Sequence, residues 1–407
     1  MTRNRRAWLC LSLAGIAALG GNTGCSGVGR GPAVPKELQD RAVVHGMANV
    51  RTWGDQVSPE VRETLVGSLR KRQAQLASTG HAEQPPSSAA LAISGGGANG
   101  AFGAGLLCGW TQKGDRPQFD VVTGISTGAL MAPFVFLGPE YDPMLREVYT
   151  TMSTKSILER RFILTAIFKD ALTDNKPLWT LTSKYIDQKM LDAIAVEYEE
   201  KGRLLLIGTT NLDARRSVIW NIGAIAASKQ PGALHLVRSI LIASAAIPAA
   251  FPPVMIDVEA DGRKFQEMHV DGGCLHEVFL YPTSFTPVEA PKAGNVTRER
   301  RAYIIRNSRI DPDWADVERR TLKIAARAID ALIYSQGVGD LDPMFMTARR
   351  DKMEFNLAYI PADFDSVPKE PFDPEYMRKL FDVGFNAARA GYPWSKTPPG
   401  YLEAAGK

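Results

Sequence analysis

One junction constrains the fold of this chain more than any other feature of the sequence. The stretch FDVVTGISTGALMAPFVF, residues 119–136, begins as a buried strand and continues as an apolar helix, with Ser126 between Gly124 and Gly128 at the turn. A strand that turns directly into a helix needs small flanking residues and pushes the side chain at its apex outward. The junction therefore predicts an α/β fold in which the Ser126 hydroxyl stands at a helix N-terminus, as in a nucleophile elbow.

The pentapeptide around Ser126 is not specific by itself. A chain with 36 glycines among 407 residues can produce a G-x-S-x-G spacing by chance. Its position between a predicted strand and a predicted helix is what favours a nucleophile over an ordinary turn.

A second glycine-rich turn lies at the start of the folded domain, in AALAISGGGANGAFGAGLLCGW. Residues 89–94 are predicted to form a short apolar strand, and a helix that packs through small residues is predicted from Ala101 onward. Between them, Gly95, Gly96 and Gly97 allow backbone N–H groups to approach a developing oxyanion, which favours an oxyanion hole. A turn that only lets the helix pack on the sheet is the simpler alternative.

The same turn also satisfies the dinucleotide-binding pattern G-x-G-x-x-G, through Gly95, Gly97 and Gly100. That interpretation requires an acidic residue at the end of the second strand, to bind the ribose. Asp120 instead begins that strand, and Ser126 follows its end. We therefore favour the oxyanion hole and expect no cofactor.

A serine nucleophile needs a base, and the best candidate lies far downstream. Asp271 ends the predicted strand in KFQEMHVDGG and is followed by Gly272 and Gly273, which would free its carboxylate to reach a neighbouring loop. A simple Asp-Gly-Gly turn is the alternative. Because an ordinary aspartate has a pKa of about 3.9 and is a weak base, we expect burial to raise the pKa of Asp271.

The bulk composition excludes several classes of protein. The net charge is +4 and the basic residues occur in short groups, such as Arg298, Arg300 and Arg301, which indicates a solvated surface and no nucleic-acid partner. No cysteine and histidine spacing of a zinc site occurs, so no metal is expected. The sequence gives no indication of protein partners.

The N-terminal 25 residues have the layout of a secretory signal. Three arginines precede an uncharged apolar run that is too short to span a bilayer, and GNTGCSG follows. Cys25 after a small residue resembles the lipobox of bacterial lipoproteins, although Asn22 stands where an aliphatic residue is usual. We expect export, with lipidation at Cys25 anchoring the protein to a membrane as a periplasmic or outer-membrane lipoprotein.

Two segments flank the predicted catalytic domain at residues 89–392. Residues 26–88 are interpreted as a tether with a helical segment, and residues 393–407 as a C-terminal tail. The helices predicted beyond residue 309 could shape an acyl pocket or form a lid, but we expect their apolar faces to lie in the core. Cys108 and Cys274 could pair in an oxidising compartment or remain buried free thiols.

Four stretches together, SGGGANGAFGAG, GISTGAL, ASAAIPAAFPPV and VDGGCLHE, resemble the patatin-like phospholipase family in identity and order. The resemblance implies a three-layer fold with a mostly parallel central sheet flanked by helices. It implies a Ser126–Asp271 dyad without histidine, an oxyanion hole at Gly95–Gly97, and hydrolysis of lipid esters through an acyl-enzyme. Asn99 departs from the family, which often has Arg or Lys at that position.

Two alternatives stay open on sequence alone. One is an α/β-hydrolase esterase with a Ser-His-Asp triad, for which His235, His269 and His276 are the available histidines. The other is a catalytically silent, membrane-tethered binding protein that retains the fold.

Overall fold

The computed structural model describes residues 29–44, 46–78, 88–151, 153, 174–282, 285 and 299–401. The predicted signal segment with Cys25 lies outside the described residues. None of the described helices is long and apolar enough to cross a membrane.

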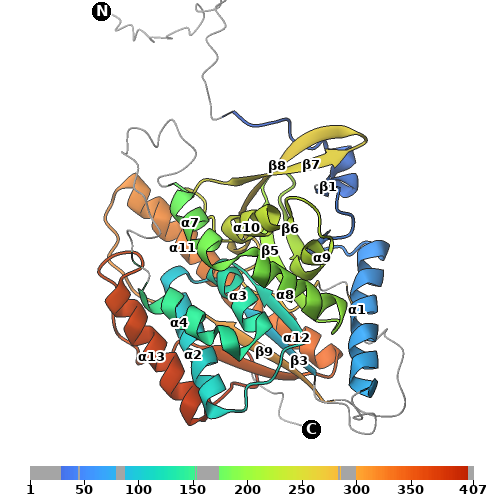
Figure 1. Cartoon of the computed structure of the whole chain (residues 1–407). Coiled ribbons are helices and arrows are strands. Elements are labelled where there is room, and N and C mark those ends of the chain that lie inside the picture. The colour runs from blue at the N-terminus through green and yellow to red at the C-terminus, as the bar shows by residue number, and fades with distance from the viewer. Residues whose placement is uncertain are drawn as a thin grey trace, which may run out of the picture.

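A single mixed sheet forms the centre of the molecule (Figure 1). Its main path has the order β1-β7-β8-β5-β4-β3-β9-β10, and β6 pairs with both β5 and β2. The strands are β1 (Val43–Val44), β2 (Arg51–Trp53), β3 (Ser88–Ile93), β4 (Val121–Gly124), β5 (Leu204–Asn211), β6 (Arg216–Asn221), β7 (Val254–Ala260), β8 (Arg263–Asp271), β9 (Arg300–Arg306) and β10 (Glu354–Tyr359).

Five consecutive strands, β5, β4, β3, β9 and the edge strand β10, are parallel. The antiparallel strands lie beyond β5, where β8 and β6 both pair with it and β7 and β1 follow. The predicted α/β class with a mostly parallel sheet is confirmed. Strands β1, β2, β7 and β9 were not predicted, and the first two come from the segment that was interpreted as a tether with a helical segment.

Helices cover both faces of the sheet, and the strands show why. Alternate residues of a strand face opposite sides, so Leu205 and Ile207 enter one core while Leu204 and Leu206 enter the other. The larger core contains the buried faces of α2, α3, α4, α10 and α13, and the smaller one contains those of α1 and α12.

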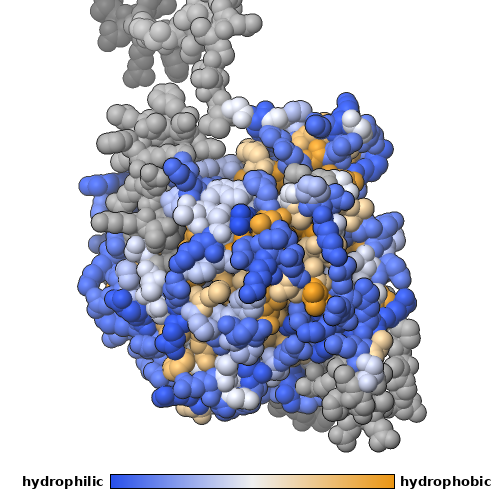
Figure 2. All heavy atoms as spheres, viewed as in Figure 1, coloured by the Kyte–Doolittle hydropathy of each residue, from blue (hydrophilic) through white to orange (hydrophobic). Residues whose placement is uncertain are grey.

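The helices are α1 (Pro59–Ser78), α2 (Gly100–Lys113), α3 (Thr127–Leu137), α4 (Asp142–Thr151), α7 (Lys176–Tyr185), α8 (Gln188–Glu199), α9 (Ile222–Ala227), α10 (Ala233–Ser244), α11 (Thr321–Gly339), α12 (Leu341–Arg350) and α13 (Pro374–Gly391). The face of the molecule in Figure 2 is largely hydrophilic, with smaller apolar areas between the charged side chains.

The expectation about the C-terminal helices is correct for two of them and wrong for the third. Helices α12 and α13 bury apolar side chains such as Phe345 and Leu380. Helix α11 does not, because Gly337 is the only buried residue among those of its residues whose exposure is described.

Candidate active site

Ser126 occupies a strained turn between β4 and α3. Its backbone has φ 54° and ψ −124°, a conformation that a residue with a side chain rarely adopts. The turn is held from below, since the Ser126 N–H donates to Ser244 Oγ at 3.0 Å and Ser244 Oγ donates to the Gly208 carbonyl at 2.7 Å. This fixation of a strained serine is typical of a functional position.

The two predicted elbow glycines are needed for close approach. A Cβ at Gly128 would lie 2.3 Å from the Ile93 carbonyl oxygen, and a Cβ at Gly124 would lie 2.5 Å from the Gly128 carbonyl oxygen. Any side chain at either position would push α3 away from the sheet.

The strand register brings Asp271 to the same place as Ser126. Strand β5 lies between β4 and β8, with Gly124 opposite Ile207 on one side and Asp271 opposite Thr209 on the other. Ser126 is two residues beyond Gly124, as Thr209 is two residues beyond Ile207. The C-terminal ends of β4 and β8 thus lie at the same edge of the sheet, one on each side of β5.

The Asp271 carboxyl group is buried and short of hydrogen bonds. Its Oδ1 accepts from the Gly273 N–H at 2.8 Å, while its Oδ2 has no well-aligned partner in the described part of the chain. Burial raises the pKa of Asp271 to about 7, and interaction with the Ser126 hydroxyl lowers it only partly. The hydroxyl is therefore close enough to act on the carboxyl group without being aligned for a strong hydrogen bond. The expected rise in the pKa of Asp271 is confirmed.

The glycine turn after β3 lies beside this pair, but one of its amides is already used. Gly95 N–H donates to the Glu277 carbonyl oxygen at 3.1 Å and is not free for a substrate oxyanion. Gly96 and Gly97 have positive φ angles of 140° and 55°, and their amides find no acceptor within the described residues. The predicted oxyanion hole is thus reduced to Gly96 and Gly97 as available donors.

Glu277 is a buried acid at this site that sequence reasoning missed. A Cβ added at Gly95 would lie 2.3 Å from Glu277 Oε1, and one at Gly273 would lie 2.4 Å from Oε2, so the carboxyl group fills the space between the two turns. Burial first, and then the charge of Asp271, raises the pKa of Glu277 well above its ordinary value. The only signal in the sequence was its position six residues after Asp271.

His269 is fully buried but is committed elsewhere. Its Nδ1 lies 3.0 Å from Thr209 Oγ1 and its Nε2 lies 3.1 Å from Glu267 Oε2. Burial lowers the pKa of His269. Both ring nitrogens are occupied by Thr209 and Glu267, so neither is available to Ser126.

The other two candidate histidines also have partners outside the site. His276 Nδ1 lies 3.2 Å from Asp340 Oδ1, and His235 stacks on Trp179 with ring centroids 5.0 Å apart. Within the described residues, no histidine hydrogen-bonds Ser126 or Asp271. This geometry favours a dyad over a triad.

Asn99, where the resemblance leads one to expect a cation, is held by a distant helix. Its Oδ1 accepts a hydrogen bond from the Tyr376 hydroxyl of α13 at 2.6 Å. The side chain therefore ties the start of α2 to α13.

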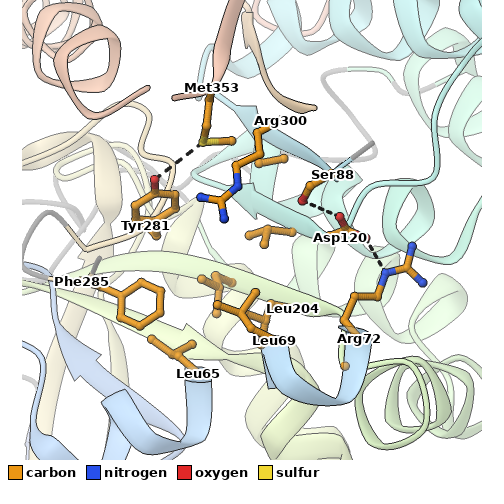
Figure 3. Close-up of a pocket in the computed structure, with 14 residues that line it drawn as sticks. Leu65, Leu69, Arg72, Ser88, Asp120, Leu204, Tyr281, Phe285, Arg300 and Met353 are labelled. Carbon is orange, nitrogen blue, oxygen red and sulfur yellow. Dashed lines mark hydrogen bonds and ion pairs between the residues drawn. The ribbon is translucent and has the colours of Figure 1, made fainter. Parts of the chain in front are cut away.

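A separate cavity of about 80 Å³ lies at the opposite edge of the sheet (Figure 3). It is lined by residues at the starts of the parallel strands, such as Ser88 and Leu204, whereas Ser126 follows a strand end. Arg72 and Asp120 form an ion pair at its wall, with Arg72 Nε 2.6 Å from Asp120 Oδ1. Because of its place, this cavity is not the reaction site.

Cys108 and Cys274 are both free thiols. Cys108 is buried in α2 and Cys274 is exposed next to Gly273. Groups of three or more metal-ligating side chains are not found among the described residues.

Comparisons with known proteins agree with the resemblance seen in the sequence. Residues 91–283 match the family model described as patatin-like phospholipase. No curated protein matches the chain. Among solved structures, VipD from Legionella pneumophila matches with a TM-score of 0.36 and 12% identity, covering 75% of this chain and 66% of its own. The chain thus spans just under two thirds of VipD, and this likeness is too low to carry an argument about function.

Proposed function

Residues 91–283 are a patatin-like phospholipase domain, and from this we propose that the chain hydrolyses lipid esters with Ser126 as nucleophile and Asp271 as general base. The family supports lipid acyl hydrolysis in general. The finer proposal depends on one observation, a strained serine whose hydroxyl acts on a buried carboxyl group with a pKa raised to about 7.

The raised pKa supports the role of a base. A carboxylate with its pKa near neutrality accepts a proton from serine much more readily than an ordinary aspartate, and it still has an ionised population near pH 7. Asp271 takes the hydroxyl proton while Ser126 Oγ attacks the ester carbonyl carbon. The amides of Gly96 and Gly97 stabilise the tetrahedral oxyanion.

Collapse of the intermediate expels the alcohol, which takes the proton from Asp271 and leaves an acyl group on Ser126. Asp271 then removes a proton from water, and the hydroxide attacks the acyl-enzyme. The fatty acid leaves, and the proton returns to Ser126. The scheme uses one carboxyl group in both half-reactions and needs neither histidine nor metal.

The substrate that we propose is a carboxylic ester of a lipid, cut in the manner of a phospholipase A or a carboxylesterase. We also propose that the protein is exported and anchored to a membrane through Cys25. Metabolic labelling with radioactive palmitate should mark the wild-type chain and not Cys25→Ser, and equal labelling of both would contradict the anchor.

The activity is tested with p-nitrophenyl butyrate on the purified full chain, beside Ser126→Ala, Asp271→Asn and His276→Gln. We expect the first two variants to lose at least 1,000-fold in kcat, on the order of what loss of a nucleophile or its base removes. His276→Gln should retain activity within about twofold. Circular dichroism checks the fold of each variant.

The same experiment separates the alternatives. An active Asp271→Asn together with an inactive His276→Gln or His269→Gln of normal stability would support a triad. A folded wild-type chain that hydrolyses neither soluble esters nor phospholipids would support a binding protein.

A further inference from the structure

The sequence of helix α11 is typical of a helix that is largely buried in the core. Its charged residues and one tyrosine form a narrow stripe, because Lys323, Arg327, Asp330 and Tyr334 are spaced by four, three and four residues. Most of the remaining arc is apolar and contains isoleucines, leucines and alanines, with Thr321, Ser335 and Gln336 as its polar residues. In a surface helix such an arc is expected to face the core.

In the structure the polar stripe is covered only in part, since Arg327 and Tyr334 are half-buried while Lys323 and Asp330 are exposed. Arg327 Nη2 lies 3.2 Å from Asp313 Oδ1, and the Tyr334 hydroxyl donates to the Ile310 carbonyl oxygen. The segment that precedes α11 therefore lies along the polar stripe and leaves the apolar arc outside.

The outward arc exposes large side chains. Ile324, Ala328 and Leu332 lie in one row at intervals of four residues and are all exposed, Ile324 by 50% and Leu332 by 71%. Trp314, in the covering segment, is 88% exposed. We call Ile324, Ala328 and Leu332 the outer apolar face. A tryptophan and long aliphatic side chains on one exposed segment are typical of surfaces that enter a lipid interface.

The C-terminal end of α11 is fastened to the candidate site. Asp340, directly after the helix, accepts a hydrogen bond from the Glu277 N–H at 2.6 Å. A Cβ on Gly337 would lie 2.9 Å from Glu277 Cγ, so the last turn packs against the same residue that fills the space beside Gly95. Helix α11 thus extends from the site to the upper left edge of the molecule in Figure 1.

Charge gives the outer apolar face no preference for anionic lipids. Residues 310–339 contain five acidic and four basic side chains, so the segment is close to neutral. A surface that binds through polybasic attraction would carry a clear excess of Lys and Arg. The occupant that fits is a zwitterionic lipid surface, bound by insertion of apolar side chains.

We propose that the outer apolar face docks the protein on a zwitterionic lipid surface and holds the Ser126 site at that surface. The choice of partner rests on the proposed function, since an enzyme that cuts lipid esters must meet them at an interface. The docking itself is a separate property and can be measured without catalysis.

The test uses the full chain with Ser126→Ala, to prevent hydrolysis, and Cys25→Ser, so that no acyl chain at residue 25 contributes to binding. Sedimentation with phosphatidylcholine vesicles is measured in 0.1 and 0.5 M NaCl. We expect binding at both salt concentrations and an increase in Trp314 fluorescence that is absent in Trp314→Phe. Leu332→Glu should weaken binding at least tenfold, because it places a charge on the most exposed aliphatic side chain of the face.

The matched control is Val196→Glu, which adds the same charge at an exposed position of α8, 43% accessible. It should bind vesicles as the parent does, and melting curves confirm that both variants are folded. With Ser126 restored, Leu332→Glu should keep its activity on soluble p-nitrophenyl butyrate while losing activity on vesicles.

Three results would overturn the inference. One is unchanged vesicle binding by folded Leu332→Glu. Another is a wild-type chain that cuts the soluble ester but does not bind vesicles, which would leave the proposed function intact. The last is a dimer in solution that Leu332→Glu converts to a monomer, which would assign the outer apolar face to a second copy of the chain.

Discussion

The negative charge of the Asp271 carboxylate is unfavourable because the group is buried. The pH dependence of the activity should show this directly. In the proposed mechanism the group must be ionised to accept the Ser126 proton, and its pKa is raised to about 7 by burial. We expect kcat/KM on p-nitrophenyl butyrate to fall about tenfold per pH unit below about pH 7 and to reach a plateau above about pH 8. A decline in kcat/KM centred near pH 4 would mean that the aspartate is not the base or is not buried in solution.

The same raised pKa predicts a cost in stability. The native protein holds a proton on Asp271 that the unfolded chain releases near pH 3.8, so stability is lost as the pH rises from about 4 through about 7. Asp271→Asn should therefore be more stable than wild type at pH 8, by up to about 4 kcal/mol, and equally stable at pH 3. Urea denaturation at both pH values measures this. Equal stability at pH 8 would contradict the unfavourable burial.

At the scale of elements, helices α2 and α13 cross so closely that the backbones almost touch. A Cβ at Gly105 would lie 2.0 Å from the Phe381 carbonyl oxygen, and one at Gly384 would lie 2.3 Å from that of Phe102. Gly105→Ala should lower the free energy of unfolding by about 2 kcal/mol, because the helices must separate.

The control for this prediction is another helical glycine with free space around it. An added Cβ at Gly67 in α1 meets no atom within 4 Å. Gly67→Ala should raise the free energy of unfolding by up to about 1 kcal/mol, through helix propensity. Equal effects of the two substitutions would show that propensity, and not the crossing, decides.

Local patterns predicted the elements whose determinants are close together in the sequence. The strand–turn–helix junctions at Gly95 and Ser126 were predicted because glycines, a buried run and a small-residue helix follow one another. Features with distant partners were not predicted. Strand β1 depends on β7, more than 200 residues away, and Glu277 could be recognised only after Gly95 was placed beside it. The outward arc of α11 could not be predicted because hydrophobic periodicity identifies an apolar face but not what covers it.

At the scale of the whole molecule, the two ends of the parallel strands differ in what they contribute to the proposed chemistry and to stability. The edge with Ser126 and Asp271 carries strain and an unfavourable charge, whereas the opposite edge is stabilised by the buried Arg72–Asp120 pair, to which Ser88 adds a hydrogen bond of 2.7 Å (Figure 3). Arg72→Met should destabilise the protein by about 3 kcal/mol, because the buried Asp120 would lose the guanidinium that lies 2.6 Å from its Oδ1. Its kcat should stay within about threefold of wild type.

The same helix offers the control. Arg70 pairs with Glu63 at 3.2 Å, but both side chains are more than half exposed. Arg70→Met should change the free energy of unfolding by less than about 0.5 kcal/mol, since exposed ion pairs contribute little. A loss of kcat in Arg72→Met without a loss of stability would contradict the division between the two edges.

The position of β5 between β4 and β8 also has a consequence for how the molecule acquires its chemistry. Ser126 and Asp271 are 145 residues apart in the sequence and meet only when β5 has paired with a parallel strand on one side and an antiparallel strand on the other. Such long-range pairings form late and slowly during folding. An unfolded or nascent chain therefore has a serine without a base. The proposed hydrolysis of lipid esters would begin only with the completed sheet.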